Sequence, residues 1–429
     1  MALSMDMRVY HALPSPHSAT SGVLIAILTI LCLGSGIFYS LKTVAQEIGV
    51  TDSSIQIGGV MDLEGDSRGL GLGMKTGIEA ALKGEQVQGR SFEFIARNDF
   101  YNPQTTITAT QELIDFGVFA MLGNVGTPTA VVSLPILAKN NVPAIGFFTG
   151  AGLLRPGVGD IFNYRASYVQ ETAKVIEAAL KAGVSSNEIC AYVQNDAYGM
   201  AGVTGIKEAL AGQADIGPTI TTLDNIIAME GTNPDRNNLG PVGVYTRNTL
   251  TSKAGYESLK NWEAVSGHPC RLVVSVGTYI PIARFAAYSR FKGENWVISA
   301  VSFTGADNFA AELKKLSVTD KVVMTQVVPP LDSDLPIVQE ARNALGDEIN
   351  YVSMEGYIAT KMFLTIMRNI AGTITRQNFV DAARGSTFDL GGLFIDFSND
   401  NQGSDFVLFT YLTEDGFRPV DENYLRQIF

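Results

Sequence analysis

Hydrophobic and polar positions alternate along most of the chain in a rhythm that is typical of α/β proteins. From Ser54 onward, short apolar runs of the β type alternate with segments in which apolar residues recur at helical spacing. The first four runs predict strands at residues 55–61, 92–96, 118–122 and 143–147. The segments between them predict helices at residues 74–82, 103–116 and 130–140. Near-continuous apolar strands separated by such helices indicate a parallel sheet that is covered on both faces.

The same rhythm repeats in the middle of the chain. Apolar runs predict strands at residues 188–193, 243–246, 271–276, 295–301 and 321–328. Helical spacing predicts helices at residues 170–182, 202–211, 254–265, 281–290 and 307–315. The pattern therefore predicts an α/β fold of two doubly wound, Rossmann-like lobes in series.

The C-terminal part of the chain mixes helices and strands. Helices are predicted at residues 355–371 and 376–384, and strands at residues 393–396 and 406–411. A tail of this kind is expected to cross back between the lobes. We therefore expect one lobe to comprise residues 54–166 and 331–385, and the other to comprise residues 167–330 and 386–425.

The N-terminal segment, residues 1–45, differs from the rest. Residues 22–38 form an apolar, uncharged run between Arg8 and Lys42, and the small residues Thr43-Val44-Ala45 precede Gln46. This arrangement predicts a cleaved signal peptide, with a retained N-terminal anchor as the alternative. A lipoprotein is disfavoured because Leu31 stands before Cys32, where a lipobox needs a small residue. We therefore expect the rest of the chain to lie outside the cytoplasm, in the periplasm.

Composition narrows the possible partners and chemistry. The chain has 429 residues and a net charge of −12, with no cluster of Lys and Arg among aromatic residues, so nucleic acid is not expected as a partner. Beyond residue 45, the cysteines are Cys190 and Cys270. An oxidising compartment permits a disulfide between them, but two separately buried thiols are the preferred interpretation.

The signatures of enzymes on α/β sheets are missing. His268, in a polar loop, is the one histidine beyond residue 45, and no nucleophile elbow, P-loop, zinc spacing or calcium loop is found. The GLGLG run at residues 69–73 lacks the glycine interval of a dinucleotide site and is better explained as a glycine-rich turn in which the backbone approaches a helix or a ligand. We expect no enzyme activity, no cofactor and no metal.

Four polar, glycine-rich loops follow predicted strands. They span residues 63–69, 124–129, 148–152 and 194–199, and a helix is expected to begin directly after each. Ligands of open α/β sheets bind at the carboxyl ends of the strands. Helix N-termini offer free N–H groups there, which suit an anionic group such as a carboxylate.

An ordered series of motifs links these loops to a known family. The chain resembles the type I periplasmic solute-binding proteins of branched-chain amino-acid ABC transporters, the leucine/isoleucine/valine-binding group, over residues 54–419. The motifs are GNVGTPTA (123–130), GFFTGAGLLRP (146–156), FNYRASYVQET (162–172), QNDAYGMAGVTG (194–205), VVMTQVVP (322–329), MEGY (354–357), DLGG (389–392) and NQGSDF (401–406). The resemblance implies two lobes joined by a multi-strand hinge, which close over a small molecule.

The resemblance also implies a set of ligand residues in the first lobe. Thr127 takes the position of the hydroxyl that holds the ligand carboxylate, although a helix N-cap is the alternative role, since Pro128 follows it. Phe148, Thr149 and Gly150 occupy the next ligand loop, where a backbone carbonyl and a hydroxyl or N–H group meet the ligand amino group.

Further positions come from the second lobe and the hinge. Tyr198 matches the aromatic residue that covers the ligand, with ordinary packing as the alternative, and Thr278 or Tyr279 matches a second one. Arg155 and Arg165 are expected to brace the hinge and loops. Arg68 and Asp66 remain open, as solvated charges or ligand contacts.

One departure from the family pattern bears on the ligand. The amino-acid binders carry a carboxylate near the end of the fourth strand of the second lobe, where it pairs with the ligand ammonium, but here residues 299–304 contain no acid before Asp307. A buried ammonium without a counter-charge is costly, and Asp196 or Glu64 would have to replace that acid. An α-amino acid, an apolar or aromatic carboxylate and a neutral polar solute therefore all remain possible, and Phe147 with Phe148 favours an aromatic or compact hydrophobic ligand.

The resemblance implies that the protein captures a solute by hinge closure and delivers it to the membrane subunits of an ABC importer. The alternative is a sensor that reports its ligand to a membrane receptor or kinase. We expect a monomer in either case.

Overall fold

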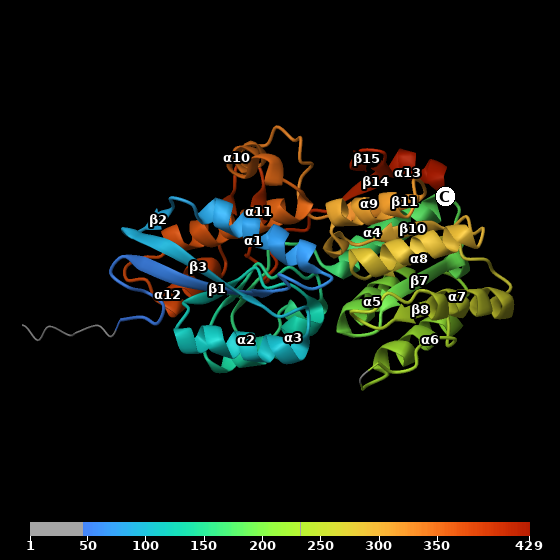
Figure 1. Cartoon of the computed structure of the whole chain (residues 1–429), viewed down its shortest axis with the longest axis horizontal. Coiled ribbons are helices and arrows are strands. Elements are labelled where there is room, and N and C mark those ends of the chain that lie inside the picture. The colour runs from blue at the N-terminus through green and yellow to red at the C-terminus, as the bar shows by residue number, and fades with distance from the viewer. Residues whose placement is uncertain (1–45, 232) are drawn as a thin grey trace, which may run out of the picture. The chain divides into compact units, whose positions relative to one another are not determined.

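Two β-sheets organise the chain. The computed structural model describes residues 46–429 except residue 232, and Figure 1 shows its helices and strands. The segment predicted as a signal peptide or anchor lies outside the described residues. Among the residues described, no helix is long and apolar enough to cross a membrane.

The first sheet has six strands in the order β2-β3-β1-β4-β5-β6. All neighbours pair in parallel except β2 and β3, which are antiparallel. Helices α1, α10 and α11 lie on one side of this sheet, and α2 and α3 lie on the other (Figure 1). The strands are β1 (Ser54–Met61), β2 (Gln86–Val87), β3 (Arg90–Asn98), β4 (Ala120–Leu122), β5 (Ala144–Ile145) and β6 (Ile161–Phe162). The helices are α1 (Arg68–Leu82), α2 (Pro103–Phe116), α3 (Thr127–Lys139), α10 (Pro336–Leu345), α11 (Tyr351–Arg368) and α12 (Arg376–Ala383).

The second sheet has seven strands in the order β15-β14-β11-β10-β9-β7-β8. Five neighbouring strands run parallel, namely β8, β7, β9, β10 and β11. Strand β14 pairs with β11, and β15 pairs with β14, both antiparallel. The strands are β7 (Ile189–Gln194), β8 (Val242–Tyr245), β9 (Leu272–Val276), β10 (Val297–Ala300), β11 (Val322–Gln326), β14 (Leu408–Thr413) and β15 (Gly416–Val420). The helices are α4 (Tyr168–Lys181), α5 (Ala197–Leu210), α6 (Gly217–Ala228), α7 (Lys253–Ser266), α8 (Tyr279–Phe291), α9 (Ala306–Lys315) and α13 (Glu422–Ile428).

The prediction of two doubly wound lobes is confirmed by these sheets. The chain passes between them after β6, after β11 and before β14, and two of these crossing segments pair with each other. Asn163 bridges Gln402 in parallel, and the N–H of Gly403 donates to the carbonyl of Asn163 at 2.8 Å. The Tyr164 hydroxyl donates to the carbonyl of Val327 at 2.8 Å, which ties the first crossing to the second. The three segments form the hinge.

The two-stranded sheet of β12 (Thr387–Asp389) and β13 (Phe394–Asp396) lies beside the first lobe. The ring of Phe397, which follows β13, lies 5.6 Å from that of Phe162 in β6. These residues fall within the range expected for the second lobe, but the chain enters the second sheet only at β14. The lobe limits themselves stay a prediction.

Helix α1 begins six residues earlier than predicted, and its first turns contain the glycine-rich run. A Cβ atom on Gly71 would lie 1.9 Å from the carbonyl oxygen of Asp62, and one on Gly77 would lie 2.1 Å from that of Ser353 in α11. Glycine is a poor helix former in isolation, but here it lets the helix approach neighbouring backbone. Tertiary packing therefore overrides local propensity in α1.

The cysteines correct a second expectation. Cys190 in β7 and Cys270, two residues before β9, form a disulfide with a Cα–Cα distance of 5.7 Å. Two separately buried thiols, the preferred interpretation of the sequence, are therefore wrong. The reason is topological: β7 pairs directly with β9, so Ile189 stands beside Leu272, although 80 residues separate the two cysteines.

Candidate functional site

Thr127 and Thr149 bring two first-lobe loops together. Thr127 is the first residue of α3, which follows β4, and its hydroxyl shares a 2.7 Å hydrogen bond with the hydroxyl of Thr149. Both side chains are fully buried. The N-cap of α3 is Gly126, with φ of 111°, so the alternative role of Thr127 as an N-cap is excluded. A Cβ at Gly126 would lie 2.4 Å from the ring of Tyr101, so this turn requires glycine.

The loop around Phe148 is held against the start of α4. Phe148 bridges Val125, and the carbonyl of Gly150 accepts a 2.8 Å hydrogen bond from the N–H of Tyr168. A Cβ at Gly150 would lie 2.7 Å from the Tyr168 ring, so the aromatic side chain packs directly on the glycine backbone. The lack of a side chain at Gly150 therefore permits the close packing of Tyr168 against this loop.

Aromatic side chains from both lobes meet at this place. Phe303, in the short 3-10 helix after β10, has its ring centroid 5.1 Å from that of Phe148 and 4.7 Å from that of Tyr198. Tyr101 lies 6.2 Å from Phe303, and Tyr168 lies 5.2 Å from Tyr198. All five rings are almost wholly buried, and we call them the aromatic cluster. Tyr198 packs against two other rings of the cluster, Tyr168 and Phe303, and its predicted role of covering the ligand stays a prediction.

Asp196 is engaged in structural contacts. One carboxylate oxygen caps α5 by accepting the N–H of Tyr198 at 3.0 Å, and the other accepts the amide of Gln194 at 2.9 Å. Arg247 lies 3.8 Å away. Burial raises the pKa of the Asp196 carboxyl, against the opposing effect of Arg247. The same Gln194 amide donates to the hydroxyl of Tyr101 at 3.2 Å, which joins the two lobes.

Of the remaining predicted residues, Tyr279 makes a separate contact between the lobes. The Tyr279 hydroxyl at the start of α8 accepts the N–H of Gly69 at 3.3 Å, and the exposed Arg68 is next to that glycine. The N–H of Thr278 donates to the Tyr245 hydroxyl at 3.0 Å. Asp66 is exposed, as is Glu64, so Glu64 supplies no buried counter-charge.

A buried ionic cluster at the hinge contacts residues 299–304, the segment that contains no acid. Ser302 donates its N–H and its hydroxyl to the carboxylate of Glu171 in α4, at 2.7 and 3.0 Å, and Thr325 in β11 donates to it at 2.6 Å. Arg165 lies 3.3 Å from Glu171 and 3.5 Å from Glu355 of α11. Arg165 therefore braces the hinge, as expected, by linking a helix of each lobe.

The charges of this cluster are coupled. Burial raises the pKa of Glu355 to about 7, and Glu171 adds to this effect while Arg165 opposes it. Burial by itself would lower the pKa of Arg165, but the neighbouring Glu355 and Glu171 outweigh burial and raise it. Arg165 therefore stays cationic, while the Glu355 carboxyl binds a proton near neutral pH.

Comparisons with known proteins agree with this architecture. The family model described as periplasmic binding protein matches residues 54–224. The solved structure of a possible leucine/isoleucine/valine-binding protein from Rhodopirellula baltica SH 1 is 31% identical, with a TM-score of 0.76, and covers 89% of this chain and 99% of its own. The chain belongs to the periplasmic binding protein family. Comparison with curated proteins gives no match.

More distant periplasmic binding proteins share the fold. A branched-chain amino acid ABC transporter protein from Thermus thermophilus with bound valine is 16% identical, with a TM-score of 0.65, and covers 88% of this chain and 99% of its own. A solute-binding protein of an ABC transporter from R. palustris in complex with 4-hydroxybenzoate is 14% identical, with a TM-score of 0.65, and covers 86% of this chain and 96% of its own. At these identities the likeness shows the fold alone.

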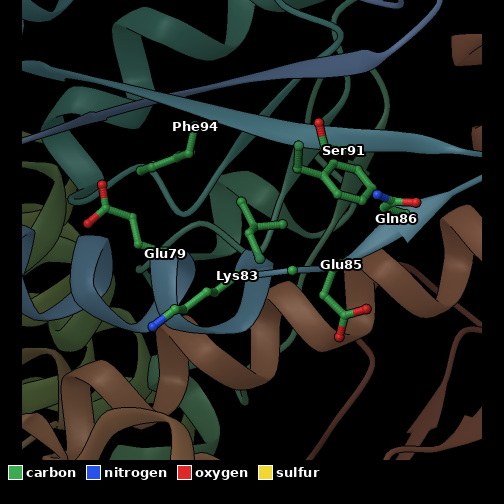
Figure 2. A pocket seen from close by; sticks show the side chains of 9 residues that line it. Glu79, Lys83, Glu85, Gln86, Ser91 and Phe94 are labelled. Atoms are coloured by element: carbon green, nitrogen blue, oxygen red, sulfur yellow. The ribbon is translucent and has the colours of Figure 1, made fainter.

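Surface cavities of this periplasmic binding protein lie away from the aromatic cluster. One of about 320 Å³ lies between α1 and the edge strands β2 and β3, where Glu79, Lys83 and Phe94 line it (Figure 2). Another of about 620 Å³ is lined by residues of α9, α11 and β15, among them Asp307 and Tyr351. Neither is lined by a predicted ligand residue, so neither changes the choice of site.

Sequence reasoning missed three residues that shape the site of this periplasmic binding protein. Phe303 and Tyr168 lie in the aromatic cluster. Glu171 binds Ser302, in the segment 299–304 that contains no acid of its own. Tyr168 and Glu171 fall within the motif at residues 162–172 and Phe303 lies outside the motifs, but in neither case does the sequence show which side chain of another segment the residue contacts. The signal for Glu171 was its place among the helix positions that face the sheet, where an acid is rare unless paired.

Proposed function

We propose that this periplasmic binding protein captures a small carboxylate-bearing or amino-acid-like solute between its lobes, outside the cytoplasm, and delivers it to an ABC importer. The observation that carries the proposal is the convergence of the Thr127–Thr149 hydroxyl pair and the aromatic cluster where the two lobes meet. Both lobes contribute side chains, so a ligand held there contacts both and favours the closed state over the open one.

The position of the site supports the proposal. Thr127 follows β4, Tyr198 follows β7 and Phe303 follows β10, so each stands just beyond the carboxyl end of a parallel strand. Ligands of open α/β sheets bind at that edge. The N-terminus of α3 adds free N–H groups beside the threonine hydroxyls, which suits a carboxylate.

The hinge supports closure as the mechanism. Three crossing segments join the lobes, and Arg165 with Glu171 and Glu355 links α4 to α11 across them. Contacts such as Gln194 to Tyr101 and Tyr279 to Gly69 join the rims. Such contacts form only when the lobes approach, so they add to the stability of the closed state.

The relatives support a small solute and an ABC importer as partners. The distant neighbours bind valine in one case and 4-hydroxybenzoate in the other, so one fold serves ligands with and without an ammonium group. A periplasmic location is proposed on the same basis, together with the disulfide, which forms in oxidising compartments.

A thermal-shift screen tests the proposal. Amino acids, aromatic and aliphatic acids, amides and sugars are each added to the purified protein. A ligand at 100 times its dissociation constant adds about 2.7 kcal/mol of stability, which raises the unfolding midpoint measurably. If no solute raises the midpoint, the proposed function is wrong.

A matched pair of variants then tests the site. Thr127→Val removes one hydroxyl of the buried pair, and the solute found in the screen is expected to bind roughly ten-fold or more weakly, as for the loss of a hydrogen bond to a charged group. Thr110→Val is the control, because Thr110 is equally buried in α2 of the same lobe and is not among the site residues. Equal affinity of the two variants would remove Thr127 from the site.

A further inference from the structure

Two buried side chains beside the aromatic cluster carry polar groups without hydrogen-bond partners among the described residues. They are the Nε of Arg165 and the hydroxyl of Tyr168. Nη1 of Arg165 likewise has no hydrogen bond and makes only the 3.5 Å ionic contact with Glu355. Buried polar groups in folded proteins nearly always have a partner, so unsatisfied donors of this kind mark a place where a hydrogen-bond acceptor is favoured.

These groups border the predicted ligand loops. The guanidinium carbon of Arg165 lies 4.9 Å from the ring centroid of Phe148 and 5.7 Å from that of Tyr168. Tyr168 packs on Gly150, and its hydroxyl lies near enough to the side chain of Thr149 to be affected by it, but without the geometry of a hydrogen bond. The unsatisfied donors therefore flank the same loop that holds the Thr127–Thr149 pair.

We propose that Arg165 and Tyr168 bind the carboxylate of a ligand that has an apolar or aromatic body and no ammonium group. This inference rests on the proposed function, because it names the ligand class of the same site. It also extends the role of Arg165 beyond bracing the hinge. Nη2 is engaged with Glu171 and Ser302, which leaves the N–H groups of Nε and Nη1 as the donors for a ligand.

The acids around the site argue against an ammonium group. The Glu171 carboxylate already accepts hydrogen bonds from Arg165, Ser302 and Thr325. Asp196 is held by Gln194, by the first turn of α5 and by Arg247. An ammonium brought into the aromatic cluster would have to displace one of these partners or stay unpaired, and a buried unpaired charge is costly.

The charge balance permits one more anion. Arg165 and Glu171 form one ion pair, and Glu355 is the second acid beside the guanidinium. Burial raises the pKa of Glu355 to about 7, so at neutral pH this carboxyl carries a proton in a large share of the molecules. A ligand carboxylate on Arg165 is expected to raise that pKa further and to draw a proton onto Glu355.

The aromatic cluster suits the rest of the ligand. Phe303 contacts two other rings of the cluster, with its centroid 5.1 Å from that of Phe148 and 4.7 Å from that of Tyr198. Rings of this kind bind an apolar or aromatic body by burial and by edge or offset stacking. A ligand body that enters the cluster has to contact or displace Phe303, since this fully buried ring touches both Phe148 and Tyr198.

Two matched series test the ligand class by titration calorimetry on the full chain. One series is phenylpropanoate, phenylpropanamide and L-phenylalanine, and the other is isocaproate, isocaproamide and L-leucine. Within a series the body is constant, while the carboxylate or the ammonium changes. In one of the two series, the acid without an ammonium is expected to bind at least ten-fold more tightly than the amide and the amino acid of that series. Its binding at pH 7 is expected to take up protons, which is measured by repeating the titration in buffers of different ionisation enthalpy.

Two variants test the residues. Tyr168→Phe removes only the unsatisfied hydroxyl, and the affinity for the acid is expected to fall roughly 10- to 100-fold while that for the amide changes less. Arg165→Lys keeps the cation but loses the fork, and it should reduce the ratio of acid to amide affinity in the same way. Tyr192→Phe is the control, because this buried tyrosine of β7 already donates to the carbonyl of Thr251.

The outcomes separate the two proposals. The inference is overturned if the amino acid binds as tightly as the deaminated acid, if acid and amide bind equally, or if Tyr168→Phe leaves their ratio unchanged. It is also overturned if neither series binds while another solute of the wider screen does, and in that case the proposed function stands. Binding of no solute at all overturns both.

Discussion

The disulfide between Cys190 and Cys270 is expected to contribute several kcal/mol to the stability of the second lobe. It closes a loop over a sequence separation of 80 residues. In the chain-entropy description, a cross-link of that span removes about 4.5 kcal/mol of conformational freedom from the unfolded state at 25 °C. Both cysteines are buried, Cys190 in β7 and Cys270 just before the adjacent strand β9, so reduction is expected to leave the native packing largely in place and to act on the unfolded chain.

Urea unfolding with and without dithiothreitol measures this contribution. Both tryptophans, Trp262 in α7 and Trp296 before β10, belong to the second lobe, so their fluorescence reports the part of the chain that carries the disulfide. With a slope of about 2–3 kcal/mol per molar urea, a loss of about 4.5 kcal/mol lowers the midpoint by roughly 1.5–2 M. Titration of the denatured full-length chain should find one thiol, that of Cys32, before reduction and three afterwards.

The control is the double variant Cys190→Ala/Cys270→Ala, whose midpoint should not respond to dithiothreitol. The reasoning is refuted if the wild-type midpoint is the same with and without reductant although the thiol count changes from one to three. A count of three before reduction would instead show that the cysteines are thiols in the purified protein.

Two further predictions concern the hinge and α1. The pKa of Glu355 rises from an ordinary 4.5 to about 7 on folding, so the folded state binds the proton more tightly, and the free energy of unfolding should fall by up to about 3 kcal/mol as the pH rises from 4.5 to 7 and level off above. Glu355→Gln should flatten this part of the stability profile measured by urea unfolding, and an unchanged slope would contradict the assignment. Gly71→Ala should lower the free energy of unfolding by about 1–3 kcal/mol, since its Cβ would lie 1.9 Å from the carbonyl oxygen of Asp62. Gly217→Ala, at the open start of α6, should change it by less than about 1 kcal/mol, and equal effects would contradict the packing argument.

The fold was accessible from the sequence because the signals that define it are local. The apolar runs at residues 188–193 and 271–276 predicted β7 and β9, because parallel strands covered on both faces are buried along their whole length and are mostly apolar. Short elements were missed because their local signal is too weak. The two residues of β6 and the seven residues of α13 carry too few periods to be recognised.

The candidate site was accessible only in part. Thr127, Phe148, Thr149, Gly150 and Tyr198 came from motifs, and the structure brings them to one place. Tyr279 was matched by the same resemblance but makes a separate contact with Gly69 at the rim of the lobes, next to the exposed Arg68. A motif assigns a residue to a loop, whereas the partner of its side chain depends on which loop of the other lobe comes opposite.

The sequence alone determined the α/β class, the order of the two lobes, the family and the lack of the usual acid beyond β10. Each of these features depends on residues that are close together in the chain. The tertiary structure decided which charged groups lie against the segment that lacks that acid. Glu171 reaches Ser302 from 131 residues away in the chain, and Arg165 joins it to Glu355 of the other lobe. The same holds for the cysteines, since sheet order places β7 beside β9. Contacts between distant segments depend on the topology of the fold and on the balance of buried charge, and the spacing of residues along one chain predicts neither.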